Sequence, residues 1–140
     1  MNILFFLTPK SEVAYVTNEF SLREVLEKME HYKYSAIPML DRNGRYVGTI
    51  TEGDLLRGFK EVNIHEAEKI PITRIPRRLN YTVVNVNAEV ESLIKVSTTQ
   101  NFVPVTDDND TFIGIVKRSD IIDYCFRRLR QQESESNERE

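Results

Sequence analysis

The residues from 48 to 54, "GTITEGD", combine two glycines, an alternating apolar and threonine stretch, and the carboxylate of Asp54. No reactive nucleophile stands beside that carboxylate. Three kinds of structure fit such a stretch: a catalytic turn, a loop that holds a phosphate, and a strand that passes into a helix. In the third case an acidic residue accepts hydrogen bonds from the free amides of the helix start, which is worth about 0.5–2 kcal/mol.

The stretch occurs a second time in the chain. "GIVKRSD" at residues 114–120 matches it at an offset of 66 residues. The match extends beyond the motif, since Pro38 aligns with Pro104 and Tyr46 aligns with Phe112 at the same offset. Further upstream the offset changes by two residues, and the apolar residues of the two copies again align. One unit has therefore been duplicated.

Each unit has the periodicity of a β-α-β-β-α segment. The first strand of each copy is rich in β-branched and aromatic residues. In the first copy Ser21 and Glu24 have the spacing of a capping box, and apolar residues mark one face of the helix that follows. The strands are predicted at 13–16, 35–40 and 45–50, and at 82–86, 101–106 and 111–116; the helices begin near 22, 54, 89 and 120.

Turn residues and prolines refine this prediction. Asn43-Gly44 is typical of a two-residue hairpin turn in which both residues have positive φ. These residues separate two antiparallel strands. Pro38 and Pro104 lie inside predicted strands, where proline removes a hydrogen-bond donor, so we expect a bulge or a sheet edge at each.

Composition and charge exclude several classes of protein. The chain has 140 residues and a net charge of −3, and residues 131–140 carry all of that excess. Residues 1–130 are therefore neutral, which does not suit binding to duplex nucleic acid. Arg74, Arg77, Arg78 and Tyr81 could form a surface for single-stranded nucleic acid, but a solvated linker is the preferred interpretation. The charged tail, 131–140, is expected to be disordered.

The reactive residues give little sign of catalysis. Cys125 is the only cysteine, which excludes an internal disulfide, suits the reducing cytoplasm, and is explained as a small buried apolar residue. His31 and His65 have no partner at metal-ligand spacing. No signal peptide and no membrane-spanning segment is predicted, because the longest apolar run near the start ends at Pro9. The sequence thus predicts neither an enzyme nor a metal site.

The tandem units resemble the CBS domain pair, or Bateman module, over residues from about 7 to 129. The resemblance rests on the paired prolines, the matching hairpins and the two Gly-x-x-(Thr or Lys)-x-x-Asp junctions. It implies an α+β fold of two tandem β-α-β-β-α repeats with pseudo-two-fold symmetry, with repeats at 1–66 and 67–130. It also implies a regulatory module that binds adenosine ligands between the repeats, forms a homodimer and acts on another protein.

The same resemblance implies roles for particular residues. The aspartate of each junction binds the ribose hydroxyls, the hydroxyl residue contacts phosphate, and adenine lies against the other repeat. The first candidate cleft then comprises Thr51, Asp54, Thr82, Gln100, Asn101 and Phe102. The second candidate cleft comprises Lys117, Arg118, Ser119, Asp120, Ala14, Tyr34, Ser35 and Ala36.

The second candidate cleft departs from the family pattern, because Lys117 stands where serine or threonine is usual. An ammonium group adds a charge-assisted contact, and Arg118 could grip another phosphate oxygen. The expected ligands are AMP, ADP and ATP, with no required cofactor. A narrower similarity, to small stand-alone bacterial CBS proteins that act as cyclic di-AMP receptors, makes that dinucleotide the alternative, although those receptors carry a basic residue at the position of Glu12. A scaffolding dimer with non-functional clefts is the remaining alternative.

Overall fold

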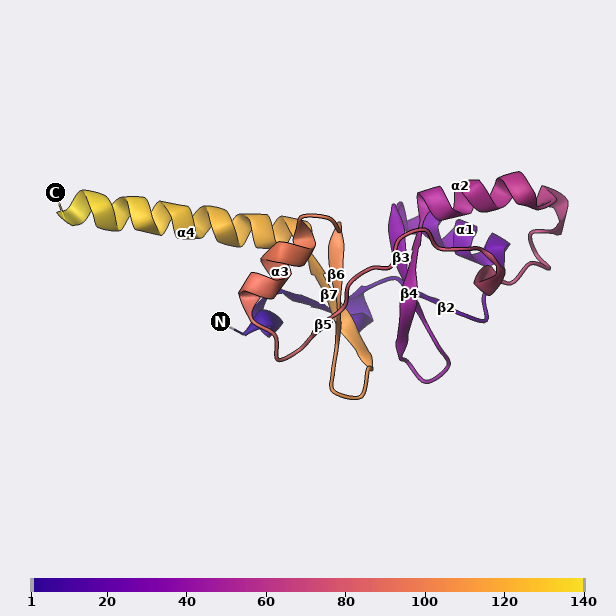
Figure 1. Cartoon of the computed structure of the whole chain (residues 1–140), viewed down its shortest axis with the longest axis horizontal. Helices are drawn as coiled ribbons and strands as arrows, with labels where there is room; N and C mark the ends of the chain where they lie inside the picture. The colour runs from indigo at the N-terminus through magenta and orange to yellow at the C-terminus, as the bar shows by residue number, and fades with distance from the viewer. Residues whose placement is uncertain (1, 140) are drawn as a thin grey trace.

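The computed structural model of the chain describes residues 2–139. Figure 1 shows two lobes, each with strands toward the middle of the molecule and helices outside. The strands are β1 (Leu7–Pro9), β2 (Val16–Thr17), β3 (Ala36–Leu40), β4 (Tyr46–Thr51), β5 (Val84–Asn85), β6 (Phe102–Thr106) and β7 (Phe112–Lys117). The α-helices are α1 (Leu22–Tyr32), α2 (Glu52–Glu61), α3 (Val90–Ser97) and α4 (Arg118–Arg139).

The strands form two sheets, ordered β2-β3-β4 and β1-β7-β6-β5. In each sheet a hairpin, β3–β4 or β6–β7, is antiparallel, and a short strand, β2 or β5, runs parallel to the first hairpin strand. The predicted α+β class and the two tandem repeats are confirmed. Each helix and strand that the pattern predicts is present, with ends that differ by a few residues.

The segments that precede the two repeats cross between them. β1 comes from the start of the chain but pairs with β7 of the second repeat, and Ile3 is fully buried in the core of that repeat. Conversely, the segment 67–75 contributes Ala67, Ile70 and Ile72 to the core of the first repeat. Each repeat is therefore completed by the residues that precede the other one.

The first helix forms as the sequence predicts. Ser21 Oγ accepts a hydrogen bond from the Glu24 amide at 3.2 Å, and Glu24 Oε1 accepts one from the Ser21 amide at 3.0 Å. Leu22, Val25 and Met29 are buried on its inner face. This capping box satisfies two amides that the helix leaves free, so the helix start is fixed locally.

The two hairpin turns are alike, but neither is the predicted two-residue turn. Gly44 has a φ of 80° whereas Asn43 does not have positive φ, and Asp110 takes the corresponding position in the second repeat with a φ of 62°. In each turn an aspartate side chain, of Asp41 or Asp107, accepts two backbone amides at 2.8 and 3.0 Å. The aspartate side chain, which pattern reasoning left out, therefore sets the longer loop.

Pro38 and Pro104 lie in central strands, not at sheet edges. The bulges that we expected follow one residue later, between Met39 and Leu40 and between Val105 and Thr106. The parallel strand beside each pairs only with residues beyond the proline, so the missing donor is not needed. The prediction of bulges is confirmed, and that of an edge is wrong.

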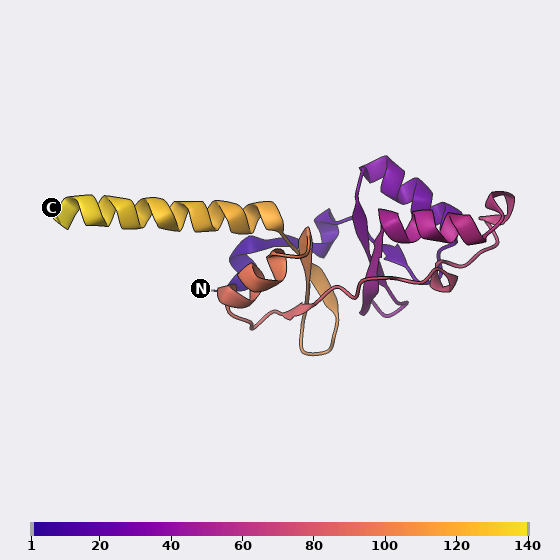
Figure 2. The same ribbon diagram turned by 45° about the horizontal axis from the view of Figure 1, so that its top comes forward.

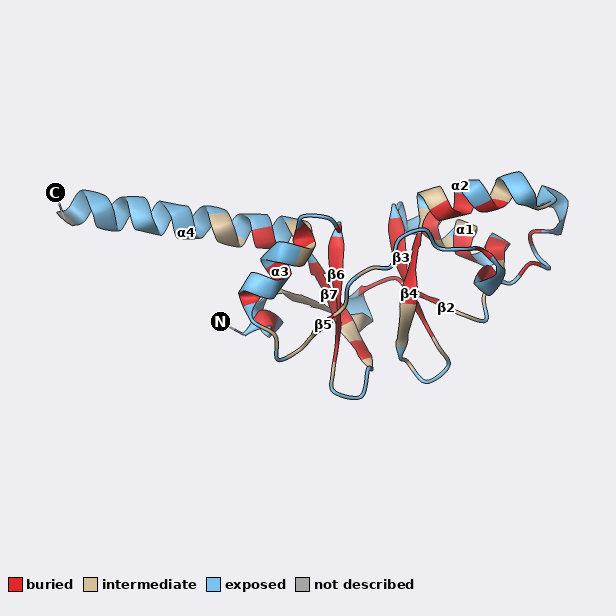
Figure 3. Cartoon of the chain, in the orientation of Figure 1, coloured by how far each residue is buried: buried red, intermediate tan, exposed pale blue. Residues whose placement is uncertain are grey.

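Contacts between the repeats form a third core. It contains Val13, Ala36, Leu40, Phe102, Phe112 and Ile115, with Tyr15, Tyr46 and Tyr81 packed against it. The Tyr46 amide donates to Asp110 O at 3.4 Å and the Phe112 amide donates to Gly44 O at 3.0 Å, which links the hairpins symmetrically. Figure 3 shows the buried residues concentrated on the central strands. This third core thus joins the two repeats.

α4 differs from the expected disordered tail. Residues 131–139 continue the helix, and Figures 1 and 2 show it extending well beyond the second lobe. Gln, Glu and Arg are good helix formers, so the helix continues although residues 131–138 are exposed. Glu140 lies outside the described residues. Cys125 is only partly buried against the second core, not fully buried as expected.

Candidate functional site

The strand–helix junction of the first repeat is a capping box. Thr51 precedes α2, and its Oγ1 accepts from the Asp54 amide at 3.2 Å. Asp54 Oδ2 in turn accepts from the Thr51 amide at 3.0 Å. The stretch "GTITEGD" is therefore a strand that passes into a helix, with both polar side chains engaged in stabilising the junction.

Asp54 is also tied to two arginines. Its Oδ1 accepts from Arg57 Nη2 at 2.6 Å and from the Arg78 amide at 3.0 Å, and the residue is only 1% exposed. Burial raises the pKa of Asp54, but the hydrogen bonds from the Arg78 and Thr51 backbone, from the Thr51 hydroxyl and from Arg57 outweigh it and lower the pKa below its ordinary value. Both carboxylate oxygens are thus engaged by the protein itself.

The second-repeat side of the first candidate cleft is also internally bonded. The Gln100 side chain accepts from the Thr82 amide at 2.6 Å and donates to Thr82 O at 3.1 Å and to Phe102 O at 3.2 Å. Phe102 is buried and its ring lies 5.3 Å from that of Tyr81. The Gln100 side chain therefore bonds Thr82 to Phe102 at the start of β6, and its amide is not free for another molecule.

Asn101 and Ser35 join the two candidate clefts. Asn101 Nδ2 donates to Ser35 Oγ at 3.2 Å, across the boundary between the repeats. The carbonyl oxygens of the same two residues accept from the first residue of a helix: Ser35 O from the Glu52 amide and Asn101 O from the Arg118 amide, each at 3.0 Å. The structure thus brings these two residues together at the pseudo-two-fold centre.

The polar side chains of the second junction are exposed, whereas those of the first are bonded within the protein. Lys117, Ser119 and Asp120 are exposed, and within residues 2–139 Asp120 forms no side-chain hydrogen bond or ion pair. Asp120 lies in a cavity of about 270 Å³, which we call the Asp120 cavity. It is lined by Phe5, Phe6, Leu7, Thr8, Asp120, Asp123, Tyr124 and Arg127. A free carboxylate beside aromatic side chains can accept hydrogen bonds from a ligand.

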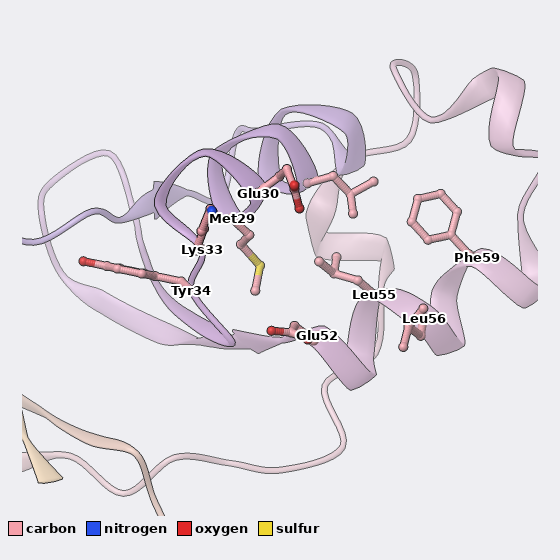
Figure 4. Close-up of a pocket in the computed structure, with 9 residues that line it drawn as sticks. Met29, Glu30, Lys33, Tyr34, Glu52, Leu55, Leu56 and Phe59 are labelled. Carbon is pink, nitrogen blue, oxygen red and sulfur yellow. The ribbon is translucent and has the colours of Figure 1, made fainter. Parts of the chain in front are cut away.

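Several predicted members of the second cleft do not line the Asp120 cavity. Arg118 Nε donates to Ser97 O at 2.9 Å, so its side chain turns toward the end of α3. Tyr34 lies beside the groove between α1 and α2, where Figure 4 shows it. Ala14 and Ala36 are buried. The residues that line the Asp120 cavity come from 5–8 and from α4, because β1 crosses to the second sheet.

Sequence reasoning did not name Arg57 or Thr8, and it assigned Arg78 and Tyr81 to a basic linker and not to these junctions. Arg57 and the Arg78 backbone bind Asp54, Tyr81 packs on Phe102, and Thr8 lines the Asp120 cavity. Burial raises the pKa of the Tyr81 hydroxyl. The spacing of Arg57 three residues after Asp54 was a usable signal. The positions of the other three depend on the crossing of the segments that precede each repeat.

The glycine that opens each junction motif makes room for that crossing segment. A Cβ at Gly48 would overlap the guanidinium of Arg77, which donates to Val47 O at 2.9 Å. A Cβ at Gly114 would overlap the carbonyl oxygen of Thr8 in β1. Gly114 is therefore needed for the close approach of the β1 backbone, whereas at Gly48 the neighbour is the end of a flexible arginine side chain.

Within residues 2–139 no group of three or more His, Cys, Asp or Glu side chains is arranged to hold a metal ion. Among the same residues, no helix combines the length and apolar character needed to cross a bilayer, α4 included.

The chain is a tandem-repeat module of two α+β repeats. Each repeat has one strand–helix junction and receives the segment that precedes the other repeat. A protein-family model of the CBS domain matches residues 6–61 and 72–127, and the chain belongs to the CBS domain family. No match was found among curated proteins.

Solved structures share the fold across nearly the whole chain. CbpB in complex with c-di-AMP has a TM-score of 0.83 at 20% identity, covering 96% of this chain and 91% of its own. CbpB of Listeria monocytogenes, also in complex with c-di-AMP, has a TM-score of 0.80 at 20% identity and coverages of 92% and 98%. CBSX2 in complex with AMP has a TM-score of 0.70 at 22% identity and coverages of 90% and 96%.

Proposed function

We propose that the chain is a regulatory module that binds an adenine nucleotide at the second junction, in the Asp120 cavity. The observation that carries this proposal is the contrast between the two aspartates. Asp54 is 1% exposed and bonded by the protein, whereas Asp120 is exposed and unpaired within residues 2–139. Binding at Asp54 requires the loss of contacts to Arg57 and Arg78, so the second junction is occupied first.

The chemistry of the Asp120 cavity suits the parts of a nucleotide. The Asp120 carboxylate accepts hydrogen bonds from a vicinal ribose diol. Lys117 and Ser119 lie at the start of α4, where free amides and the helix dipole favour an anionic phosphate. Phe6 and Tyr124, whose ring centroids are 5.1 Å apart, offer apolar surface to a base. AMP, ADP and ATP all contain these three parts.

Cyclic di-AMP is a second candidate ligand, favoured by Lys117. This side chain replaces a neutral hydroxyl with an exposed ammonium just before α4, and Arg127, paired with Asp123 at 2.9 Å, lines the Asp120 cavity. The additional ammonium suits a ligand with a second phosphate. Support also comes from the CbpB structures, which contain c-di-AMP, while the CBSX2 structure contains AMP.

Titration calorimetry and thermal shift with AMP, ADP, ATP and cyclic di-AMP test the proposal. A ligand at 100 times its Kd adds about 2.7 kcal/mol and raises the Tm by several degrees. Asp120→Asn is expected to weaken binding about tenfold or more, because the amide is a poorer acceptor than the charged carboxylate.

The matched control is Asp123→Asn, one turn further along α4 in the same cavity. It is expected to change the affinity less than Asp120→Asn. If none of the four compounds binds, the chain is a scaffolding protein with non-functional clefts. If Asp54→Asn abolishes binding and Asp120→Asn does not, the ligand occupies the first junction instead.

The proposal includes a homodimer and a protein target. A regulatory module needs a partner to receive the signal, and the ligand shifts the equilibrium between arrangements of the repeats only by its difference in affinity for them. We assign no catalytic step to the chain. Pull-down from the native host with and without the bound nucleotide tests for the target, and a partner that is captured equally in both states contradicts a regulatory role.

A further inference from the structure

A cavity of about 680 Å³, which we call the β5 cavity, lies at one edge of the second sheet. It is lined by 82–85, Ala88, Ser92, Lys95, Val96, Thr98 and Thr99. Successive residues of a strand point to opposite faces of a sheet, so a cavity that four of them line lies beside the strand. β5 is the last strand of its sheet, and Figures 1 and 2 show it running below α3. The β5 cavity therefore separates a free strand edge from α3.

The first repeat has a corresponding surface, which can be compared residue by residue. Val16 of β2 pairs with Met39, and Val84 of β5 pairs with Val105, so β2 and β5 correspond at an offset of 68 residues. The same offset brings the first residue of α1 onto the first residue of α3. Positions around the β5 cavity therefore have known counterparts beside β2.

Large side chains occupy the surface beside β2. Lys28 Nζ lies 5.4 Å from the centroid of the Tyr15 ring and 5.6 Å from that of the Phe20 ring, and all three residues are partly buried. Their counterparts are three smaller apolar residues that line the β5 cavity: Val83, Ala88 and Val96. The second repeat thus lacks two aromatic rings and a lysine stem at this place, and the cavity is the space that they would fill.

The charge at this surface is also reversed between the repeats. Lys95 is the only charged residue that lines the β5 cavity, and it is exposed. Its counterpart Glu27 pairs with Arg23 at 3.0 Å, whereas Lys95 forms no ion pair within residues 2–139. The hydroxyls of Thr98 and Thr99 donate to carbonyl oxygens of α3 at 2.7 and 3.3 Å. An ammonium group is therefore the available charged donor beside an apolar cavity.

The strand edge beside the cavity is held in place from its inner side. The Gln100 side chain bonds both the amide and the carbonyl of Thr82, and Val84 pairs with Val105 of β6. In an extended strand the backbone groups of alternate residues point to opposite edges, so those of Val83 point outward. An edge strand of this kind is a template for a further strand.

From these observations we propose that the protein target of the module docks an extended acidic segment along β5. An aromatic side chain of that segment enters the β5 cavity, where it restores the filling that Tyr15 and Phe20 give to the first repeat. A carboxylate beside it pairs with Lys95, and the edge of β5 supplies backbone hydrogen bonds. The inference deepens the proposed function, because it rests on the existence of a protein target but not on the nucleotide.

Selection from a phage-displayed library of random peptides tests the preference of this surface. On the wild-type chain the enriched peptides are expected to combine an aromatic residue with a nearby aspartate or glutamate. Fluorescence anisotropy then gives the Kd of a synthetic peptide from the selection. Ala88→Phe and Val83→Tyr, which copy Phe20 and Tyr15 and fill the cavity, are each expected to weaken its binding about tenfold or more. Glu91→Phe, on α3 outside the cavity, is the matched control and is expected to retain binding.

Charge reversal provides a second measurement. Lys95→Glu, which copies Glu27, is expected to weaken the same peptide about tenfold and to bind better a version in which lysine replaces the acidic residue. Circular dichroism verifies that each variant folds. A selection that enriches no sequence, or only sequences without an aromatic residue, overturns the inference. Undiminished binding to both cavity-filling variants does so too.

Two further outcomes separate this inference from its alternatives. N-acetyl-tyrosine is an aromatic carboxylate without an extended chain, and if it binds as tightly as the selected peptide, the cavity takes a small molecule and the docking of a segment is wrong. The cavity-filling variants are expected to bind nucleotide as the wild-type chain does, because the Asp120 cavity shares no lining residue with the β5 cavity. Failure of the peptide selection therefore leaves the nucleotide site intact, and failure of nucleotide binding leaves the peptide result intact.

Discussion

Asp54 and Asp120 occupy the same position in two copies of one motif, yet their surroundings differ. Asp54 has Arg57 three residues later and the Arg78 amide above it, and both bind its carboxylate. The residue three positions after Asp120 is Asp123, which pairs with Arg127 instead. Contacts from Thr51, from Arg57 and from the Arg78 amide therefore separate a structural carboxylate from one that is available to a ligand.

The lowered pKa of Asp54 predicts how stability depends on pH. Because the folded chain holds this carboxylate ionised, its contribution is present above the ordinary aspartate pKa of about 3.9 and is lost as pH falls through the lower folded value. Asp54→Asn is expected to reduce the free energy of unfolding at pH 7 by about 1.5–3 kcal/mol. Urea unfolding from pH 7 to 3 measures this, and the gap between the chains should narrow below about pH 4. An equal gap at both ends of that range would contradict the assignment.

Lys117 predicts a preference among phosphates. Lys117→Ala is expected to weaken binding of cyclic di-AMP or ATP more than binding of AMP, because a charge-assisted contact worth about 1.5–3 kcal/mol is lost only where a further phosphate is reached. Calorimetry at two salt concentrations measures it. The matched control is Lys95→Ala, on α3 outside the Asp120 cavity. Unchanged affinity of Lys117→Ala for all the ligands would refute the role.

At the scale of elements, the two hairpins have the same kind of turn but differ in the residue that takes positive φ. Asp41 and Asp107 fix each loop through the same pair of amide contacts, and the residue with positive φ is Gly44 in one and Asp110 in the other. Glycine adopts this conformation without strain, while aspartate is among the few other residues that tolerate it. The conformation of the loop is therefore set by the aspartate side-chain contacts, and the residue with positive φ changes only how much strain the loop carries.

This comparison predicts an asymmetric response to substitution. Gly44→Ala is expected to lower the free energy of unfolding by about 1–2 kcal/mol, because alanine is strained at a φ of 80°. Gly44→Asp, which copies the second repeat, is expected to cost less. Steric contact does not explain the difference in stability between the two variants, since an added Cβ meets only Lys10 Nζ at 3.5 Å. Denaturant unfolding measures both, and a larger loss for aspartate than for alanine would contradict the explanation.

At the scale of the whole molecule, the repeats are interlocked. The segment before each repeat completes the sheet or the core of the other, as β1 does for β7 and as residues 67–75 do for the first core. Tyr46 and Phe112 lie face to face across the pseudo-two-fold centre, with ring centroids 6.4 Å apart. Burial raises the pKa of the Tyr46 hydroxyl to about 12, in keeping with its place in the shared core. Neither repeat is an independent unit.

Interlocking predicts that a change at the start of the chain loosens the second repeat. Ile3→Ala is expected to lower the free energy of unfolding by about 2–5 kcal/mol, because Ile3 is fully buried in the second core. Leu4→Ala, at a residue that is 46% exposed, is the matched control with a smaller effect. Hydrogen exchange should speed up in β6 and β7 more than in β3 and β4. Faster exchange confined to the first repeat would contradict the interlocked arrangement.

The sequence by itself determined the elements, because they depend on local patterns. Duplication fixed the number of repeats, apolar periodicity placed the strands and helices, and the Ser21–Glu24 spacing gave the first capping box. It also found Thr51, Asp54 and Asp120 as the residues of the two junctions. Each of these inferences needs only residues that lie within a turn or two of one another, or a direct comparison of the two copies.

The tertiary structure decided which residues meet at those junctions. Arg78 reaches Asp54 and Thr8 reaches the Asp120 cavity because the leading segments cross between repeats, a contact between residues distant in the chain that no local pattern encodes. Burial also distinguishes Ala14 and Ala36, which are buried, from Lys117 and Ser119, which are exposed where α4 begins. Only packing of the whole chain fixes such contacts, since the residues that meet are far apart in the sequence.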